Sequence, residues 1–347
     1  MLETSEEIIE AIRAATATGF RGRLIARGQA RAMIWRNGIL PDEAPEFTFQ
    51  LSEDLQGYAY SLIGLGLRLR EINGESAYSR LAFEYAATAL ESVIAKGDRH
   101  NDDSDFHFVM AAASYHLAHL SARAYSLLAI VNEDQNFSAI EQILTKLIQR
   151  DFSTLRSSVL SYRADGEGSE ERIIEGIRGA AFPYEERDDD SADVEHDPLL
   201  EGLDTALTDI YMSAISLYIL AVERGERIFL TKAIHKLRTG LEVCSRFNML
   251  PQWWVILITI HLLSDLWSDT FHELLPTNSV GGEAGTWPDL REAFISLLMR
   301  RSRAEIDLWP SQREAALRAV NDEDDLVVSL PTSAGKTRIA EALSMAF

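Results

Sequence analysis

The segment 325–341 constrains the fold more than any other part of the sequence. It begins with the short valine-rich run 326–330, continues with small residues and Gly335-Lys336-Thr337, and ends in residues that favour a helix. The apolar run predicts a buried strand. A strand, a small-residue loop, Gly-Lys-Thr and a helix form the order of a phosphate-binding loop. We therefore expect this segment to supply the first strand and helix of an α/β domain.

The residue types of this loop suit a polyphosphate. Backbone N–H groups and the positive end of the following helix would bind phosphate oxygens, and small side chains would let the backbone approach them. Lys336 would place a charge at the β- and γ-phosphates, and the Thr337 hydroxyl would be a ligand of Mg²⁺. Leu330 stands where the strict pattern has glycine, so the loop is a variant. The predicted cofactor-binding residues of the loop are Thr332, Ser333, Ala334, Gly335, Lys336 and Thr337.

A second signal lies upstream, where Leu308-Trp309-Pro310-Ser311-Gln312 opens an amphipathic helix. Residues 309–341 resemble the start of a superfamily 2 helicase core, and the form Pro-Thr-Ser-Ala-Gly-Lys-Thr is most similar to the Ski2-like branch of the DEAD/DEAH-box helicases. The resemblance implies a RecA-like domain that uses ATP and Mg²⁺. It also implies that Gln312 reads the adenine edge and that Trp309 packs near the base. An amide can both donate to and accept from one adenine edge, and the alternative for Gln312 is a solvent-exposed helix residue.

The resemblance covers only this last part of the sequence. No Asp-Glu-x-His box, second RecA-like lobe or arginine finger follows it. A motor needs such groups to position water and to stabilise the transferred charge. We therefore assign no catalytic residue and expect this fragment alone not to hydrolyse ATP, whereas the full-length protein would be an ATP-dependent helicase.

The sequence before the loop has the pattern of paired helices. Around residues 81–93, apolar and alanine side chains recur at helical spacing and predict a wide buried face. The expected fold class is mostly α, with a repeat-like accessory domain similar to α-solenoid or tetratricopeptide folds, followed by the RecA-like start. The expected organisation is a basic helical arm (1–50), a helical hairpin block (51–164), an acidic mobile insertion (165–198), a second helical block (199–275), a flexible joint (276–288) and the start of the helicase domain (289–347).

The charge of the chain restricts how it can meet nucleic acid. It has 33 basic and 54 acidic residues and a net charge of −21, so contact with nucleic acid has to be local or belong to the motor. No acidic residue lies between Glu10 and Asp42, and Arg23, Arg27 and Arg31 recur at every fourth position, which would place them in one stripe on a helix. The partner of this stripe could be the chain's own carboxylates with solvent, another protein, or a phosphate backbone.

Several features predict a soluble cytoplasmic protein. Cys244 is the single cysteine, which excludes an internal disulfide, and its apolar helical surroundings favour a core residue over a nucleophile. The acidic N-terminus lacks the basic-then-apolar order of a signal peptide. The apolar run 253–263 is too short to cross a bilayer, so we expect no membrane contact.

Three functions are compatible with these features. In the first, the helical region is an accessory or partner-docking domain of a helicase or translocase, and the resemblance suggests bacterial antiphage defence with a nuclease or effector partner. In the second, the chain is a helical-repeat interaction scaffold without NTPase activity. The third is a signalling NTPase with a helical sensor, which the Trp309–Gln312 signal disfavours. An Asp-Glu-x-His or Asp-Glu-Ala-Asp box further along the reading frame would decide for the motor.

Overall fold

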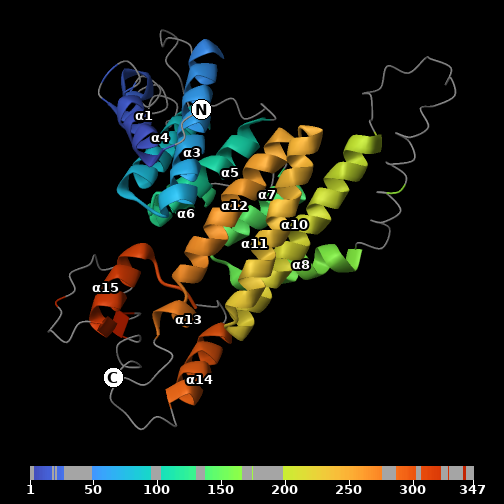
Figure 1. Cartoon of the computed structure of the whole chain (residues 1–347). Coiled ribbons are helices and arrows are strands. Elements are labelled where there is room, and N and C mark those ends of the chain that lie inside the picture. Colours follow the sequence, from blue (N-terminus) through green and yellow to red (C-terminus); the bar gives the residue numbers. More distant parts are fainter. Residues whose placement is uncertain are drawn as a thin grey trace. The chain divides into compact units, whose positions relative to one another are not determined.

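The computed structural model (Figure 1) describes the chain in its helical segments and the turns beside them. The described residues are 4–17, 19, 22–26, 49–94, 103–129, 137–165, 174, 198–275, 287–301, 306–321, 327 and 339–340. Within them the chain is almost entirely helical, and the β-structure consists of one antiparallel bridge between Thr270 and Asp307. The prediction of a mostly α-helical, repeat-like chain is confirmed. The predicted strand at 326–330 falls almost wholly outside the described residues.

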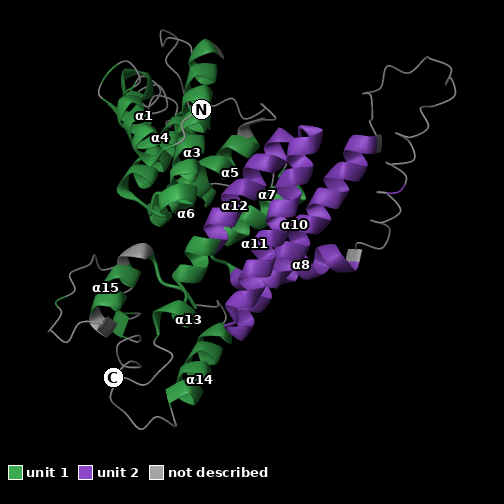
Figure 2. Ribbon diagram, in the orientation of Figure 1, with its two compact units in different colours: residues 1–151, 264–347 green, residues 152–263 purple. Residues whose placement is uncertain are grey.

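The chain divides into two compact units, coloured separately in Figure 2. Unit 1 comprises residues 1–151 and 264–347, and unit 2 comprises residues 152–263. The boundary falls inside α12 (Leu250–Ser268), so the predicted second helical block 199–275 contributes to both units. Helix α14 begins at Trp287, within the predicted joint 276–288, and the rest of that joint lies outside the described residues.

Unit 1 starts with helices that pack as antiparallel hairpins. They are α1 (Ser5–Thr16), α3 (Phe49–Asn73), α4 (Ala77–Ile94), α5 (Asp103–Leu117), α6 (Ser121–Leu128) and α7 (Ala139–Ile148). The predicted apolar face of α4 is buried at Ala82, Ala86, Ala89, Leu90 and Val93, whereas Leu81 and Tyr85, also predicted on it, are half-buried. Helices α3 and α4 approach closely because Gly66 has no side chain: a Cβ there would lie 3.0 Å from the buried Phe83 ring. Small residues at the contact thus set the spacing of this hairpin.

The remaining helices of unit 1 come from the C-terminal part of the chain. They are the end of α12, then α13 (Phe271–Leu274), α14 (Trp287–Met299) and α15 (Pro310–Asn321). Arg291 on α14 donates hydrogen bonds to the carbonyl oxygens of His272 (2.5 Å) and Leu275 (3.3 Å). These bonds satisfy carbonyl groups at the end of α13, where no further helical turn supplies N–H donors.

Unit 2 consists of α8 (Phe152–Asp165), α10 (Pro198–Arg224), α11 (Arg227–Phe247) and most of α12. Helix α11 buries one face at Leu230, Ala233, Leu237, Gly240 and Cys244, which recur at helical spacing. A Cβ at Gly240 would lie 3.2 Å from Cδ1 of Ile256. Burial raises the pKa of the Cys244 thiol to about 11, as expected of a core residue and not of a nucleophile.

One described helix passes a length-and-composition test for crossing a membrane. It is the stretch Leu199–Arg224 of α10, and 56% of its apolar window is buried within the structure. Core helices of soluble proteins pass the same test, because a helix that packs on several sides is apolar around most of its circumference. The test is therefore weak evidence for a membrane.

Candidate functional site

The end of helix α7 has an unusual backbone conformation. Arg150 has φ of 56°. Its N–H donates to the carbonyl oxygen of Leu147 (3.1 Å), and the N–H of Asp151 donates to the carbonyl oxygen of Lys146 (3.2 Å). This left-handed helix end is normally occupied by glycine or asparagine. For an arginine the conformation costs about 1–2 kcal/mol. Such a cost points to a requirement for the side chain.

The Arg150 side chain is 7% exposed and binds two carboxylates. Its Nη2 lies 2.9 Å from Oδ2 of Asp269, and its Nη1 lies 2.9 Å from Oδ2 of Asp307. Nη1 also donates to the carbonyl of Leu308 (2.8 Å), and the guanidinium carbon lies 5.3 Å from the centre of the Trp309 ring. We call these five residues, Arg150, Asp269, Asp307, Leu308 and Trp309, the Arg150 node.

Backbone hydrogen bonds hold the two acidic segments of the node together. The N–H of Phe271 donates to the carbonyl of Ile306 (2.9 Å), and the N–H of Leu308 donates to the carbonyl of Asp269 (2.9 Å). Arg313, in the first turns of α15, donates from Nε to the carbonyl of Ser268 (3.1 Å). The start of α15 is therefore fixed to the end of α12 and the end of α7.

A second charged group adjoins the node. Arg70 forms a buried ion pair with Asp265, and Nε2 of His119 lies 3.2 Å from Oε1 of Glu75. His119 also has a left-handed backbone, with φ of 63° at the end of α5. Thus two of the three described non-glycine residues with positive φ direct a charged or titratable side chain into this region.

A polar cavity of about 60 Å³ lies between the two groups, lined by residues that include His116, Asp265, Asp269 and Arg313. Nδ1 of His116 and Oδ2 of Asp265 face no hydrogen-bond partner among the described residues. A polar space of this size can hold water. Among the described residues, no group of His, Cys, Asp or Glu has the geometry of a metal site.

Burial is the largest influence on the pKa of three of these groups, Asp269, Asp265 and His116. It raises the pKa of Asp269 to about 6, and the Arg150 charge only partly offsets this. Burial likewise raises the pKa of Asp265, against the effect of Arg70. For His116, burial and the nearby charge of Arg150 lower the pKa well below its usual value, so the ring is neutral. The hydrogen bond from His119 lowers the pKa of Glu75.

The structure places two of the predicted site residues, Trp309 and Gln312, side by side. Trp309 is half-buried beneath the Arg150 guanidinium. Gln312 is buried, and its Oε1 accepts a hydrogen bond from the N–H of Trp309 (2.9 Å), which caps the first turn of α15. The alternative of a solvent-exposed Gln312 is therefore wrong, and adenine recognition stays a prediction. Thr332, Ser333, Ala334, Gly335, Lys336 and Thr337 lie outside the described residues.

The sequence did not indicate the residues that make the node. Arg150, Asp269 and Asp307 belong to three separate segments, and no local pattern connects them. The usable signal was a helix end at 148–151 without glycine or asparagine at the position that favours them. Of the predicted arginine stripe, Arg23 is described and exposed, whereas Arg27 and Arg31 lie outside the described residues.

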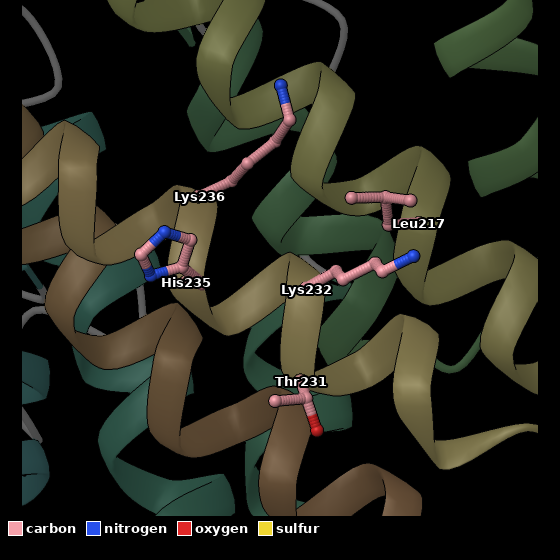
Figure 3. Close-up of a pocket in the computed structure, with 5 residues that line it drawn as sticks. All are labelled: Leu217, Thr231, Lys232, His235 and Lys236. Atoms are coloured by element: carbon pink, nitrogen blue, oxygen red, sulfur yellow. The ribbon is translucent and has the colours of Figure 1, made fainter.

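Unit 2 has an open groove of about 380 Å³ between α10 and α11. It is lined by Leu217 of α10 and by Thr231, Lys232, His235 and Lys236 of α11. Figure 3 shows that both lysine side chains extend toward the helix that carries Leu217. The surface that lines the groove is apolar, and the two lysines contribute their aliphatic stems to it.

Comparison with known proteins gives one informative likeness. No family model matches the chain. The chain is 20% identical over 320 residues to the Hachiman protein HamB of Bacillus cereus, an alignment that covers 91% of the chain and 25% of that relative. It therefore spans about a quarter of the length of the curated relative it matches, and the likeness includes nearly all of the helical region.

Proposed function

We propose that a full-length protein containing this chain is an ATP-dependent nucleic-acid helicase or translocase that acts in bacterial antiphage defence, with the helical region as its accessory domain. The resemblance of residues 309–341 to helicases supports the motor, with ATP and Mg²⁺ as cofactors. The likeness to the Hachiman protein HamB supports the defence role. Nucleic acid would meet the motor in the cytoplasm, and a protein partner such as a nuclease or effector would dock on the helices.

The observation that carries this proposal is the attachment of α15 to the helical region. Trp309 and Gln312 begin the helicase-like segment, and Arg150 holds that beginning through Asp307, Leu308 and Trp309. A buried guanidinium with two carboxylates is a rigid connection, because separating the groups would leave charges unpaired away from water. The accessory helices would thus be a fixed support for the first helix of the motor.

The motor is tested by a Lys336→Ala substitution in the full-length protein. Loss of the lysine charge should abolish ATP hydrolysis stimulated by nucleic acid, since that charge would neutralise the β- and γ-phosphates. Arg68→Ala is a suitable control, because Arg68 is exposed and its ion-pair partner among the described residues is Glu71 of the same helix (3.1 Å). Stimulated hydrolysis that survives Lys336→Ala would contradict the proposal.

The second candidate is a helical interaction scaffold without NTPase activity. The burial of Gln312 favours it, because the amide oxygen that would read adenine already accepts a hydrogen bond from Trp309. Nucleotide binding discriminates between the two candidates. A motor that reads adenine should bind a fluorescent ATP analogue more tightly than the GTP analogue, and Gln312→Glu should remove this preference. A scaffold should bind neither nucleotide.

A further inference from the structure

Helix α11 has a charge opposite to that of the chain. It carries Arg227, Lys232, Lys236, Arg238 and Arg246 against a single carboxylate, Glu242. The whole sequence has 54 acidic and 33 basic residues. A basic helix in so acidic a chain creates a local positive potential that attracts anions.

The basic side chains of α11 lie on its solvent side. Lys232, His235, Lys236, Thr239 and Arg246 are exposed and recur at spacings that place them along one side of the helix. We call these five residues the α11 stripe. The other side of the helix holds the buried residues of the unit 2 core, among them Leu237 and Cys244. Packing against α10 therefore orients the stripe outward.

The cations of this surface lack acidic partners. Among the residues that the structure describes, no carboxylate lies within 4 Å of the charged nitrogens of Lys232, Lys236, Arg238 or Arg246. Some exposed arginines elsewhere have such partners, whereas others, such as Arg163 and Arg300, have none among the described residues. Arg68 lies 3.1 Å from Glu71, and Arg156 lies 3.2 Å from Glu223. Pairing is thus available to some exposed cations in this acidic chain, and within the described part of the chain the α11 stripe has no carboxylate partner.

The groove beside the stripe gives it a shape suited to an extended polyanion. Lys232 and Lys236 lie one helical turn apart and extend toward the helix that carries Leu217, α10 (Figure 3). Two ammonium groups can contact successive phosphates, and the apolar wall can contact a sugar or a base. The groove has a volume of about 380 Å³ and is open to solvent.

We propose that the α11 stripe binds the sugar-phosphate backbone of nucleic acid without sequence preference. Charge complementarity carries this inference, and the choice of nucleic acid over an acidic protein rests on the proposed function. The contact would lie on the helical region and not on the motor segment. It would let an acidic protein bind its polymer by a local surface.

The test measures binding of a fluorescent single-stranded oligonucleotide to the chain by anisotropy, without nucleotide, over a series of salt concentrations. Lys232→Gln with Lys236→Gln should weaken binding about tenfold at low salt, by a similar factor for different base sequences. The slope of log Kd against log salt should decrease in magnitude by about 1.4, since each phosphate contact on a single strand contributes about 0.7.

The matched control is Arg68→Gln with Arg156→Gln, which removes the same charge from exposed positions that already have carboxylate partners. It should leave the affinity and the salt slope nearly unchanged. Equal weakening by both double variants, or an unchanged slope in the lysine variant, would overturn the proposal. Binding of polyglutamate in preference to the oligonucleotide would also overturn it, because the stripe would then select an acidic protein.

The test of the α11 stripe can be distinguished from the test of the motor. Lys336→Ala should not alter oligonucleotide binding by the α11 stripe in the absence of nucleotide. Suppose that Lys336→Ala leaves ATP hydrolysis intact while Lys232→Gln with Lys236→Gln still weakens oligonucleotide binding. The motor assignment is then wrong, and the proposal that the α11 stripe binds nucleic acid is supported. Suppose instead that Lys232→Gln with Lys236→Gln leaves oligonucleotide binding unchanged while Lys336→Ala abolishes hydrolysis. The proposal for the α11 stripe is then wrong, and the motor assignment is supported.

Discussion

The Arg150 node and the α11 stripe are both concentrations of positive charge in an acidic chain, and they differ in every other respect. Arg150 is buried and has two carboxylates at 2.9 Å, whereas Lys232 and Lys236 are exposed with no carboxylate nearby among the described residues. A cation withdrawn from water must be paired, but a hydrated cation can remain available for an external anion. The position of the counter-charge therefore distinguishes a structural arginine from a binding surface.

Removing the Arg150 guanidinium should have the largest effect on stability. Arg150→Ala removes the nearest cation from buried Asp269, which keeps only Arg313 at 3.6 Å among the described residues, and from part-buried Asp307. Breaking such a pair typically costs about 3–5 kcal/mol. The free energy of unfolding from urea titration measures this loss. Arg150→Gly loses the same contacts but relieves the left-handed backbone, so it should be about 1 kcal/mol more stable than Arg150→Ala. An alanine variant as stable as the wild type would show that the node is not a structural pair.

The pH dependence of the node comes next in size. Since burial raises the pKa of Asp269 from 3.8 to about 6, the folded chain binds this proton more tightly than the unfolded chain. The contribution of this group to stability is fully present below about pH 4 and is lost as the pH rises through about 6, by at most about 3 kcal/mol. The difference in unfolding free energy between wild type and Asp269→Asn should therefore fall over that range. A difference that stays constant or rises with pH would contradict the raised pKa.

The end of α11 provides the counterpart of the end of α7. Asn248 is exposed and has φ of 56°, close to that of Arg150. It needs the conformation but no buried side-chain contact. Asn248→Ala should cost about 1 kcal/mol, while Asn248→Gly should be neutral or slightly stabilising. Urea titration of both variants checks this, and a loss from Asn248→Gly comparable with that from Arg150→Gly would remove the distinction between the two helix ends.

The smallest effect is expected on the α11 stripe. Lys232→Gln with Lys236→Gln should change the free energy of unfolding by less than about 0.5 kcal/mol, because both side chains are exposed and break no ion pair when replaced. Thermal or urea unfolding gives the measurement. A large destabilisation would assign the lysines to the fold and would undermine their role in binding.

Local rules of the sequence predicted much of the fold. The spacing of Ala82, Ala86 and Leu90 identified a buried helical face, and burial of Cys244 followed from its apolar helix. The division into units was not foreseen. One boundary lies inside a continuous helix, α12, and the other lies in the short turn between α7 and α8, within the predicted block 51–164. The burial of Gln312 was also missed. Its exposure depends on what packs against α15, which the pattern of α15 alone does not contain.

The sequence by itself determined which segments are helical, where small residues permit close packing, and that residues 309–341 resemble a helicase start. These properties follow from neighbours within a few residues along the chain. Only the tertiary structure decided that Arg150 meets Asp269 and Asp307, and that Trp309 lies beneath it. Such contacts join segments separated by more than a hundred residues, and their strength comes from burial, which is a property of the packed helices and not of any one of them.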